Sequence, residues 1–134
     1  GANGASIMFI AGLTTSSPSN SATTYLGPFL SSNATSTESN VQQVVPVGGT
    51  LSHLSVRLGN DPGTNNSWSF RVRRNGANTN VVCTVSGSTA SSCSDTVNTQ
   101  AFSAGDVLTL QLTPSSDPDN AGSVRWAVAY AAAD

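Results

Sequence analysis

The sequence predicts an all-β protein, an antiparallel β-sandwich of the jelly-roll type, and three observations predict it. Short apolar runs recur along the 134 residues and are separated by turns rich in Gly, Pro, Asn and Ser. Several of these runs alternate apolar and polar residues, which is the pattern of half-buried strands. No longer window shows a helical period. Because roughly eight or more short strands in a chain of this length suit two packed sheets, a single jelly-roll domain is expected over residues 7–134.

The strands expected in the N-terminal half are short, and their sequence patterns are less regular than those of the C-terminal half. Pro28 interrupts one run, so that run is expected at a sheet edge, where a missing N–H costs little. The Gly48–Gly49 pair is expected to turn one strand into the next. The expected strands cover residues 6–13, 25–30, 41–47 and 50–58.

The C-terminal half alternates more regularly. Asn75–Gly76 is expected to form a type I′ hairpin turn, because that turn needs positive φ at both central positions. An immunoglobulin-like sandwich is the second choice for the fold, but its cysteines lie far apart on facing sheets, and here they are close neighbours. The expected strands cover residues 68–73, 80–85, 93–97, 107–112 and 123–130.

The composition excludes some classes of protein. Only 9% of residues are charged and the net charge is −2, so neither the high charge typical of disorder nor the basic surface typical of nucleic-acid binding is present. Arg71, Arg73 and Arg74 form a short basic cluster, in which Arg71 and Arg73 are expected to be the solvated face of a strand. No apolar run is long enough for a membrane helix. We therefore expect no nucleic acid and no membrane insertion.

A surface rich in Ser, Thr and Asn with few charges is expected outside cells, on a cell, spore or virion surface. Two segments, beginning at Asn33 and Asn65, match the N-glycosylation pattern, which an Asn-rich sequence also produces by chance. Whether either is modified stays open.

The chain offers little material for a catalytic site, and we expect no enzyme activity and no cofactor. The single histidine, His53, lies in an expected strand, where an exposed or interface histidine is the favoured interpretation. Nearly all carboxylates fall in turns or at strand starts, where Asp caps its own backbone. Asp117 and Asp119 could ligate calcium, but a solvated turn is the favoured interpretation.

Cys83 and Cys93 flank a Gly/Ser/Thr turn between two expected strands. Residues placed across such a turn can come within disulfide reach, so we expect a disulfide. Two buried thiols are the alternative. No Cys-x-x-Cys pair accompanies them, so no zinc site is expected.

Residues 1–6, GANGAS, form two Gly-X-Y triplets, the period of a collagen triple helix. Taken alone, this signal favours a flexible tail over the end of a stalk.

A set of strand and turn motifs extends over roughly residues 40–130. The motifs are WSFRVRRNGANT at 68–79, VCTVSG at 82–87, SCSDT at 92–96, AGDVL at 104–108 and VRW at 124–126. The chain resembles the C-terminal globular domain that follows Gly-X-Y repeats in bacterial and phage collagen-like proteins, to which the head of exosporium collagen-like glycoproteins is related. The resemblance implies a TNF-like or complement-head-like jelly roll that forms homotrimers, and it favours a Gly-X-Y stalk end at residues 1–6.

The resemblance supplies no catalytic residues. For the trimer axis we expect aromatic residues of outer strands, namely Tyr25, Phe70, Trp126 and Tyr130. At least one of Phe70 and Trp126 is expected to belong to the intramolecular core instead.

The sequence leaves three functions open, all of them non-catalytic. The first is a trimeric structural or adhesive head on an extracellular fibre, whose partner is itself or a surface receptor. The second is a filament subunit that donates an N-terminal strand to a neighbour, with Ile7, Phe9, Ile10 and Leu13 as the donor residues. The third is a carbohydrate-binding module, which is weakened because most aromatic residues lie in strands rather than loops.

Overall fold

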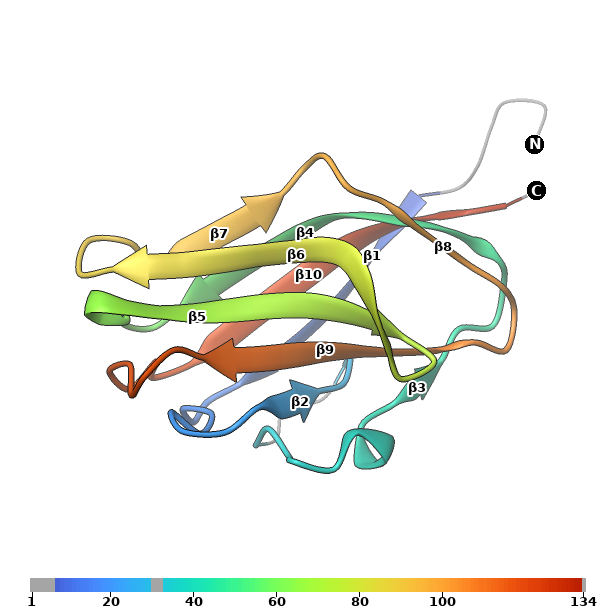
Figure 1. Ribbon diagram of the computed structural model, residues 1–134. Coiled ribbons are helices and arrows are strands. Elements are labelled where there is room, and N and C mark those ends of the chain that lie inside the picture. Colours follow the sequence, from blue (N-terminus) through green and yellow to red (C-terminus); the bar gives the residue numbers. More distant parts are fainter. Residues whose placement is uncertain (1–6, 30–32, 134) are drawn as a thin grey trace.

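The computed structural model describes residues 7–29 and 33–133, so the Gly-X-Y segment at residues 1–6 lies outside the described residues. The regular secondary structure of the described chain is almost wholly strand, with one short 3-10 helix (Figure 1). None of its helices has the length and hydrophobicity needed to cross a lipid bilayer. The elements are β1 Ile7–Thr14, β2 Thr24–Leu26, the 3-10 helix η1 Glu38–Asn40, β3 Gln43–Val44, β4 Gly49–Leu58, β5 Gly63–Arg74, β6 Ala77–Gly87, β7 Ser92–Asp95, β8 Gln100–Phe102, β9 Val107–Pro114 and β10 Val124–Ala132.

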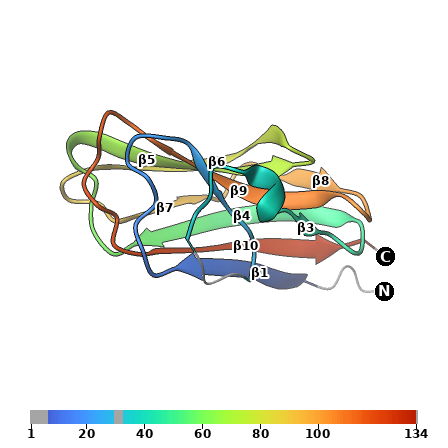
Figure 2. The same cartoon turned by 90° about the horizontal axis from the view of Figure 1, so that it is seen from below.

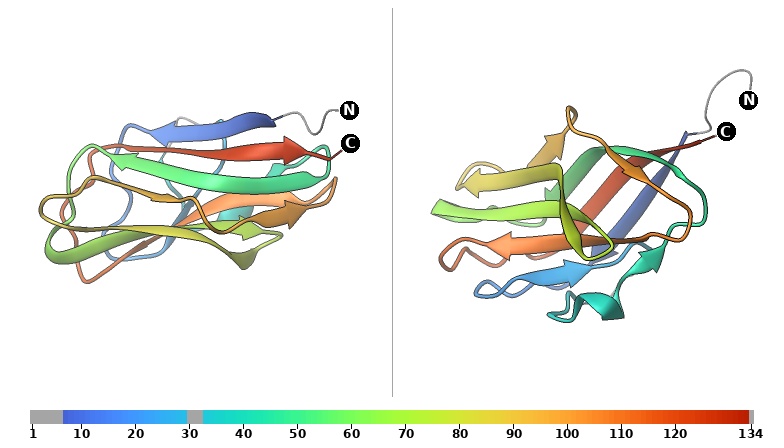
Figure 3. Two further views of the ribbon diagram at one scale, coloured as in Figure 1. Left: turned by 90° about the horizontal axis from the view of Figure 1, so that it is seen from above. Right: turned by 45° about the vertical axis from the view of Figure 1, so that its right-hand side comes forward.

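The strands form two antiparallel sheets that pack face to face (Figures 2 and 3). One sheet has the order β1-β10-β4-β7, with β8 also beside β4, and is called the β10 sheet below. The other has the order β2-β9-β5-β6, with β3 also beside β9, and is called the β9 sheet.

The pairing is nested, which is the defining feature of a jelly roll. The innermost pair is β5 with β6; around it β4 pairs with β7 and β8, then β2 and β3 with β9, and finally β1 with β10. The chain passes from sheet to sheet at each level of this nesting. The all-β sandwich expected from the sequence is therefore confirmed.

The core lies between the sheets and is built from the alternating residues of the long strands. The side chains of Trp68, Phe70 and Val72 on β5 are fully buried, as are those of Leu110 and Leu112 on the neighbouring β9. The period of two in the sequence identified these inward positions correctly, because successive side chains of a strand point to opposite faces.

The turn at Asn75–Gly76 has φ values of 52° and 76°, so both residues adopt the positive φ that the sequence predicts. The expected turn at Gly48–Gly49 does not join two neighbouring strands. Instead β3 pairs with β9 and β4 pairs with β10, so this segment crosses from one sheet to the other. A Cβ atom on Gly49 would lie 2.5 Å from the carbonyl oxygen of Ala131, so a larger residue would not fit at the crossing.

Cys83 and Cys93 form a disulfide with a Cα–Cα distance of 5.7 Å, which confirms the expectation. Cys83 lies on β6 of the β9 sheet and Cys93 on β7 of the β10 sheet. The bond therefore joins the two sheets at the side of the sandwich where β6 and β7 are edge strands.

Candidate self-association surface

The outer face of the β9 sheet is polar, and its arginines are engaged by neighbouring groups: Arg71 Nη1 donates a 2.7 Å hydrogen bond to the Thr79 carbonyl. Arg73 forms an ion pair with Glu38 of η1, with 2.9 Å between Nη2 and Oε1. The Arg73 hydrogen bond, helped by that of the Thr109 hydroxyl at 2.6 Å, holds the pKa of Glu38 below its usual value against the effect of burial. The same guanidinium lies 5.6 Å from the centre of the Tyr25 ring. The guanidinium of Arg73 is thus engaged in contacts within the domain.

The outer face of the β10 sheet is different, because small and large apolar side chains cover its β1 side. Residues paired in register share a face, and Ile7 is paired with Ala131 and Phe9 with Ala129. The side chains of Ile7 and Phe9 are 74% and 75% exposed. With Ala127 they form the patch that we call the β10 face: Ile7, Phe9, Ala11, Ala127, Ala129 and Ala131.

The β10 face continues onto β4 as a row of hydroxyl groups. Thr50, Ser52 and Ser55 lie opposite Ala131, Ala129 and Ala127 in the register of β4 and β10. None of these residues is charged. An exposed sheet face that combines large apolar side chains, alanines and hydroxyls is characteristic of a surface that another protein surface covers.

The apolar surface extends around the β1 edge of the sandwich into a small groove. The groove has a volume of about 170 Å³ and lies between β1 and β3. Met8, Phe29 and Val44 line it, and their side chains are 50%, 71% and 52% exposed. Phe29 is held there by a backbone hydrogen bond of 2.7 Å from its N–H to the Ala11 carbonyl. The exposed apolar surface therefore covers both sides of β1.

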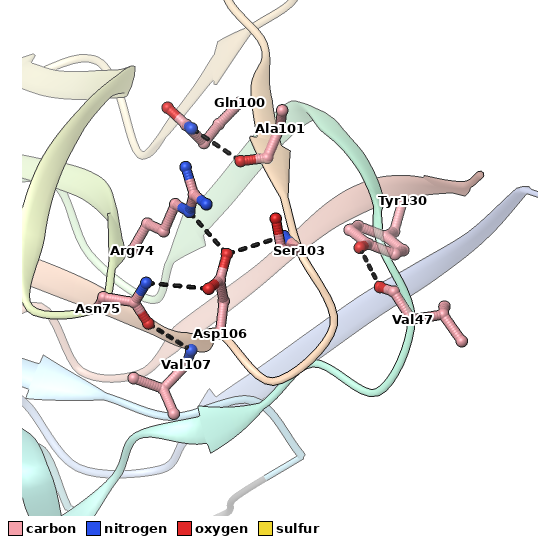
Figure 4. A network of polar contacts seen from close by, with 9 residues as sticks. All are labelled: Val47, Arg74, Asn75, Gln100, Ala101, Ser103, Asp106, Val107 and Tyr130. Atoms are coloured by element: carbon pink, nitrogen blue, oxygen red, sulfur yellow. Dashed lines mark hydrogen bonds and ion pairs between the residues drawn. The ribbon is translucent and has the colours of Figure 1, made fainter.

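A polar network fixes the end of the molecule at which β1 begins (Figure 4). The Asp106 carboxylate accepts hydrogen bonds from Asn75 Nδ2 at 3.0 Å, the Ser103 backbone N–H at 2.8 Å and Arg74 Nε at 2.7 Å. These bonds, with that of Asn75 the largest, lower the pKa of Asp106 to about 2. The carboxylate is therefore charged at neutral pH and ties the β5–β6 turn to the start of β9.

Tyr130 supports the same end of the molecule from inside. Its hydroxyl donates a 2.6 Å hydrogen bond to the Val47 carbonyl, and burial raises its pKa. The bond attaches the crossing segment between the sheets to β10 (Figure 4).

The aromatic residues expected at a trimer axis do not lie on the β10 face. The side chains of Phe70, Trp126 and Tyr130 are 0%, 3% and 2% exposed and pack in the core, which corrects their assignment to an interface. Both Phe70 and Trp126 belong to the core, where at least one was expected. Tyr25 is half-buried on the outer face of the other sheet, beside Arg73.

The proposed donor residues all lie on β1, which pairs with β10 of its own chain over its whole length. Ile10 points into the core and Leu13 is half-buried, whereas Ile7 and Phe9 are exposed. Sequence reasoning missed the alanines of β10. The signal was present, because Ala127, Ala129 and Ala131 alternate with buried residues and therefore had to face outward.

The single histidine lies at a bulge in β4. His53 has a φ of 56°, and its Nδ1 lies 2.9 Å from the hydroxyl of Ser52. In the part of the chain that the structure describes, no three His, Cys, Asp or Glu side chains come together as a metal site. Asp117 and Asp119 are exposed in the β9–β10 loop, and the backbone N–H of Asp119 donates to the Pro62 carbonyl at 2.8 Å.

Comparison of the sequence with protein-family models finds no match, and comparison with curated proteins finds none either. The class that the fold and the surface define is a jelly-roll domain with an internal disulfide, one polar outer face, and a second outer face that is apolar on its β1 side. Its function has to be argued from that asymmetry.

Proposed function

We propose that this domain is a non-catalytic structural head that associates with copies of itself, as a homotrimer, on an extracellular fibre or surface. The single observation that supports this most is the β10 face, on which Ile7 and Phe9 are about three-quarters exposed beside a row of alanines. The motifs that resemble collagen-associated heads add the expectation of three copies.

The physical reason is the free energy of burying these side chains. Fully burying one large aliphatic or aromatic side chain contributes roughly 1.5–3 kcal/mol, and each copy has two on this face and further ones around the groove. The alanines of β10 allow a second backbone to approach closely. The adjacent hydroxyls of β4 can form hydrogen bonds across such an interface without burying a charge.

The position of the chain ends supports a parallel, threefold arrangement. Residue 7 at the start of β1 and residue 133 after β10 lie at the same end of the molecule (Figure 1). Copies related by a threefold axis are parallel, so their N-terminal segments would leave the assembly at one end. A Gly-X-Y stalk requires that arrangement, because its three chains must be in register.

The test is the mass of the protein in solution. With a chain mass of 13.6 kDa, a trimer has a mass of about 41 kDa, and sedimentation at micromolar concentration should show it. The double variant Ile7→Ser with Phe9→Ser should sediment as a monomer. The control is Val97→Ser, which removes an 83% exposed valine from the β7–β8 turn and should leave the trimer intact. A wild-type protein that is only monomeric contradicts the proposal.

Assembly by strand exchange is a second candidate, supported by the position of β1 as an edge strand that, among the described residues, pairs with β10 alone. An exchanged edge strand links each copy to the next and has no reason to close at three. The same sedimentation run separates the candidates. Exchange gives a series of masses above the trimer, and association through the β10 face gives one closed species.

A further inference from the structure

Two arginines of the described chain lie side by side without a carboxylate partner. Arg57 on β4 and Arg125 on β10 are register partners, and both side chains are exposed. The ion pairs found among the described residues use Arg73 with Glu38 and Arg74 with Asp106. Arg57 and Arg125 take part in neither of them.

This arrangement is unfavourable for the fold. Like charges placed directly opposite each other on antiparallel strands are destabilising. The chain has only 5 basic residues in 134, all of them arginine, and two of these are adjacent on one face. Packing does not require them there, because both side chains point to solvent. The pair is therefore better explained by a negatively charged ligand than by the needs of the fold.

The two arginines line a shallow, open groove on the outer face of the β10 sheet. Its volume is about 640 Å³. Ser92 on β7 is the register partner of Arg57, and Ser94 is the register partner of Ser55. Arg125, Arg57 and Ser92 thus form one row across three strands. The groove is lined by no Asp or Glu.

We infer that this groove binds an acidic saccharide. The guanidinium groups of Arg57 and Arg125 pair with a carboxylate or sulfate group of the sugar, because a planar guanidinium matches such groups with two parallel hydrogen bonds. The hydroxyls of Ser55, Ser92 and Ser94 bind sugar hydroxyls, for which they can act as both donors and acceptors. An open groove accepts part of a longer chain.

The lining of the groove favours a saccharide over other acidic polymers. Nucleic-acid binding uses many phosphate contacts and aromatic side chains on which bases stack, and here Trp126 lies behind the sheet, only 3% exposed. An extended peptide is recognised through pockets for its alternate side chains, whereas the exposed lining side chains here are those of serines and arginines, beside the half-buried Cys93 and Ala127.

The arginines of the groove lie away from Ile7 and Phe9, whereas Ser55 and Ala127 belong both to the groove and to the surface proposed for self-association. Arg125 and Arg57 lie near the start of β10 and the end of β4, and Ile7 is paired with the far end of β10. The ribbon views show that these ends of β10 lie at opposite ends of the sandwich (Figures 1 and 3). A monomeric Ile7→Ser, Phe9→Ser variant should therefore still bind the saccharide, so the two proposals can fail separately.

The test is titration calorimetry at low salt with three tetrasaccharides: one sulfated, one bearing only carboxylates, and one uncharged. At least one acidic sugar should bind, and the uncharged one should not. Arg57→Gln and Arg125→Gln should each weaken binding by about tenfold, the loss of one charge-assisted pair. Arg71→Gln is the matched control, since it removes the same charge from the opposite face and should change affinity by less than about twofold.

Several outcomes would overturn the inference. They are no binding of either acidic sugar, an equal loss in the Arg71→Gln control, and equally tight binding of inorganic sulfate. A change in the mass of the assembly in Arg57→Gln and Arg125→Gln would instead make a second copy the occupant. Thermal unfolding checks the variants: without ligand, both should be at least as stable as the wild type, because each removes a repulsion.

Discussion

Asp95 is a buried carboxylate on β7 that joins the two sheets through its hydrogen bond from Val82 on β6. It is 7% exposed, and it accepts the backbone N–H groups of Val97 and Asn98 at 3.0 Å and of Val82 at 3.2 Å. Burial alone would raise its pKa, but the bonds from Asn98, Val97 and Val82 outweigh burial and lower the pKa to about 2. The sequence predicted Asp95 near a strand start. It gave no sign of the bond to Val82, since that contact joins two sheets.

Acid should therefore destabilise the fold as Asp95 and Asp106 become protonated. In the folded protein the pKa values of Asp95 and Asp106 are about 2, below the ordinary 3.8, so as the pH falls the unfolded chain binds protons first. The stability due to these groups is complete above about pH 4 and is lost between about pH 4 and pH 2. Urea unfolding at a series of pH values measures this loss.

The variant Asp95→Asn is the control for this prediction, because its amide cannot titrate. It should be less stable than the wild type at pH 7, and its stability should fall less steeply with acid. A wild type whose stability is constant between about pH 4 and pH 2 would contradict the assignment of these carboxylates.

At the scale of elements, each strand of the described chain overlaps an expected strand except β8, which the sequence did not predict. β5, β9 and β10 bury one side of a regular pattern, so the period of two was enough to find them. β8 is short and pairs at the end of a longer strand, so its existence depends on a neighbour distant in sequence. β3, expected within residues 41–47, covers only Gln43–Val44 for the same reason. The Gly48–Gly49 pair predicts a turn between two strands, but local turn residues do not reveal which sheet the chain enters next.

Gly12 sets how closely β1 can approach the core. A Cβ atom there would lie 2.8 Å from Nε1 of the buried Trp126 and 3.0 Å from the carbonyl oxygen of Gly27. Gly12→Ala should therefore destabilise the domain by about 1–3 kcal/mol, the usual cost of overpacking. Gly48→Ala is the matched control, since its nearest contact is 3.4 Å, and it should be close to neutral in urea unfolding. Equal stability of the Gly12→Ala and Gly48→Ala variants would contradict this prediction, because it would show that β1 shifts to accommodate the added methyl group.

The disulfide acts on the pair of edge strands at the other side of the sandwich. The cysteines are 10 residues apart, and closing a loop of this size contributes about 3 kcal/mol on the chain-entropy model. Replacing both with serine should lower the free energy of unfolding by about that amount while the circular dichroism spectrum keeps its β form. A loss of unfolding free energy below about 0.5 kcal/mol would contradict this prediction, because it would mean that the disulfide does not restrict the unfolded chain.

On the scale of the whole molecule, the two outer faces define what the domain can do. The alternating pattern of the sequence predicted which residues of each strand point inward, and therefore which residues point outward. It did not show which strands are neighbours. Only the nested order places Ile7 and Phe9 of β1 beside the alanines of β10, at the opposite end of the chain. The candidate surface is thus a product of topology, which explains why sequence reasoning chose aromatic residues that the core required.

Self-association through the β10 face should make the thermal stability depend on protein concentration. A trimer unfolds to three separate chains, so mass action raises its melting temperature as concentration rises. Between about 1 µM and 100 µM the melting temperature of the wild type should increase by several degrees, and that of the Ile7→Ser, Phe9→Ser variant should stay constant. Differential scanning calorimetry measures both. At the lowest concentration the two proteins should converge, because neither serine replaces a core residue. A wild-type melting temperature that is constant over this range would contradict self-association through the β10 face.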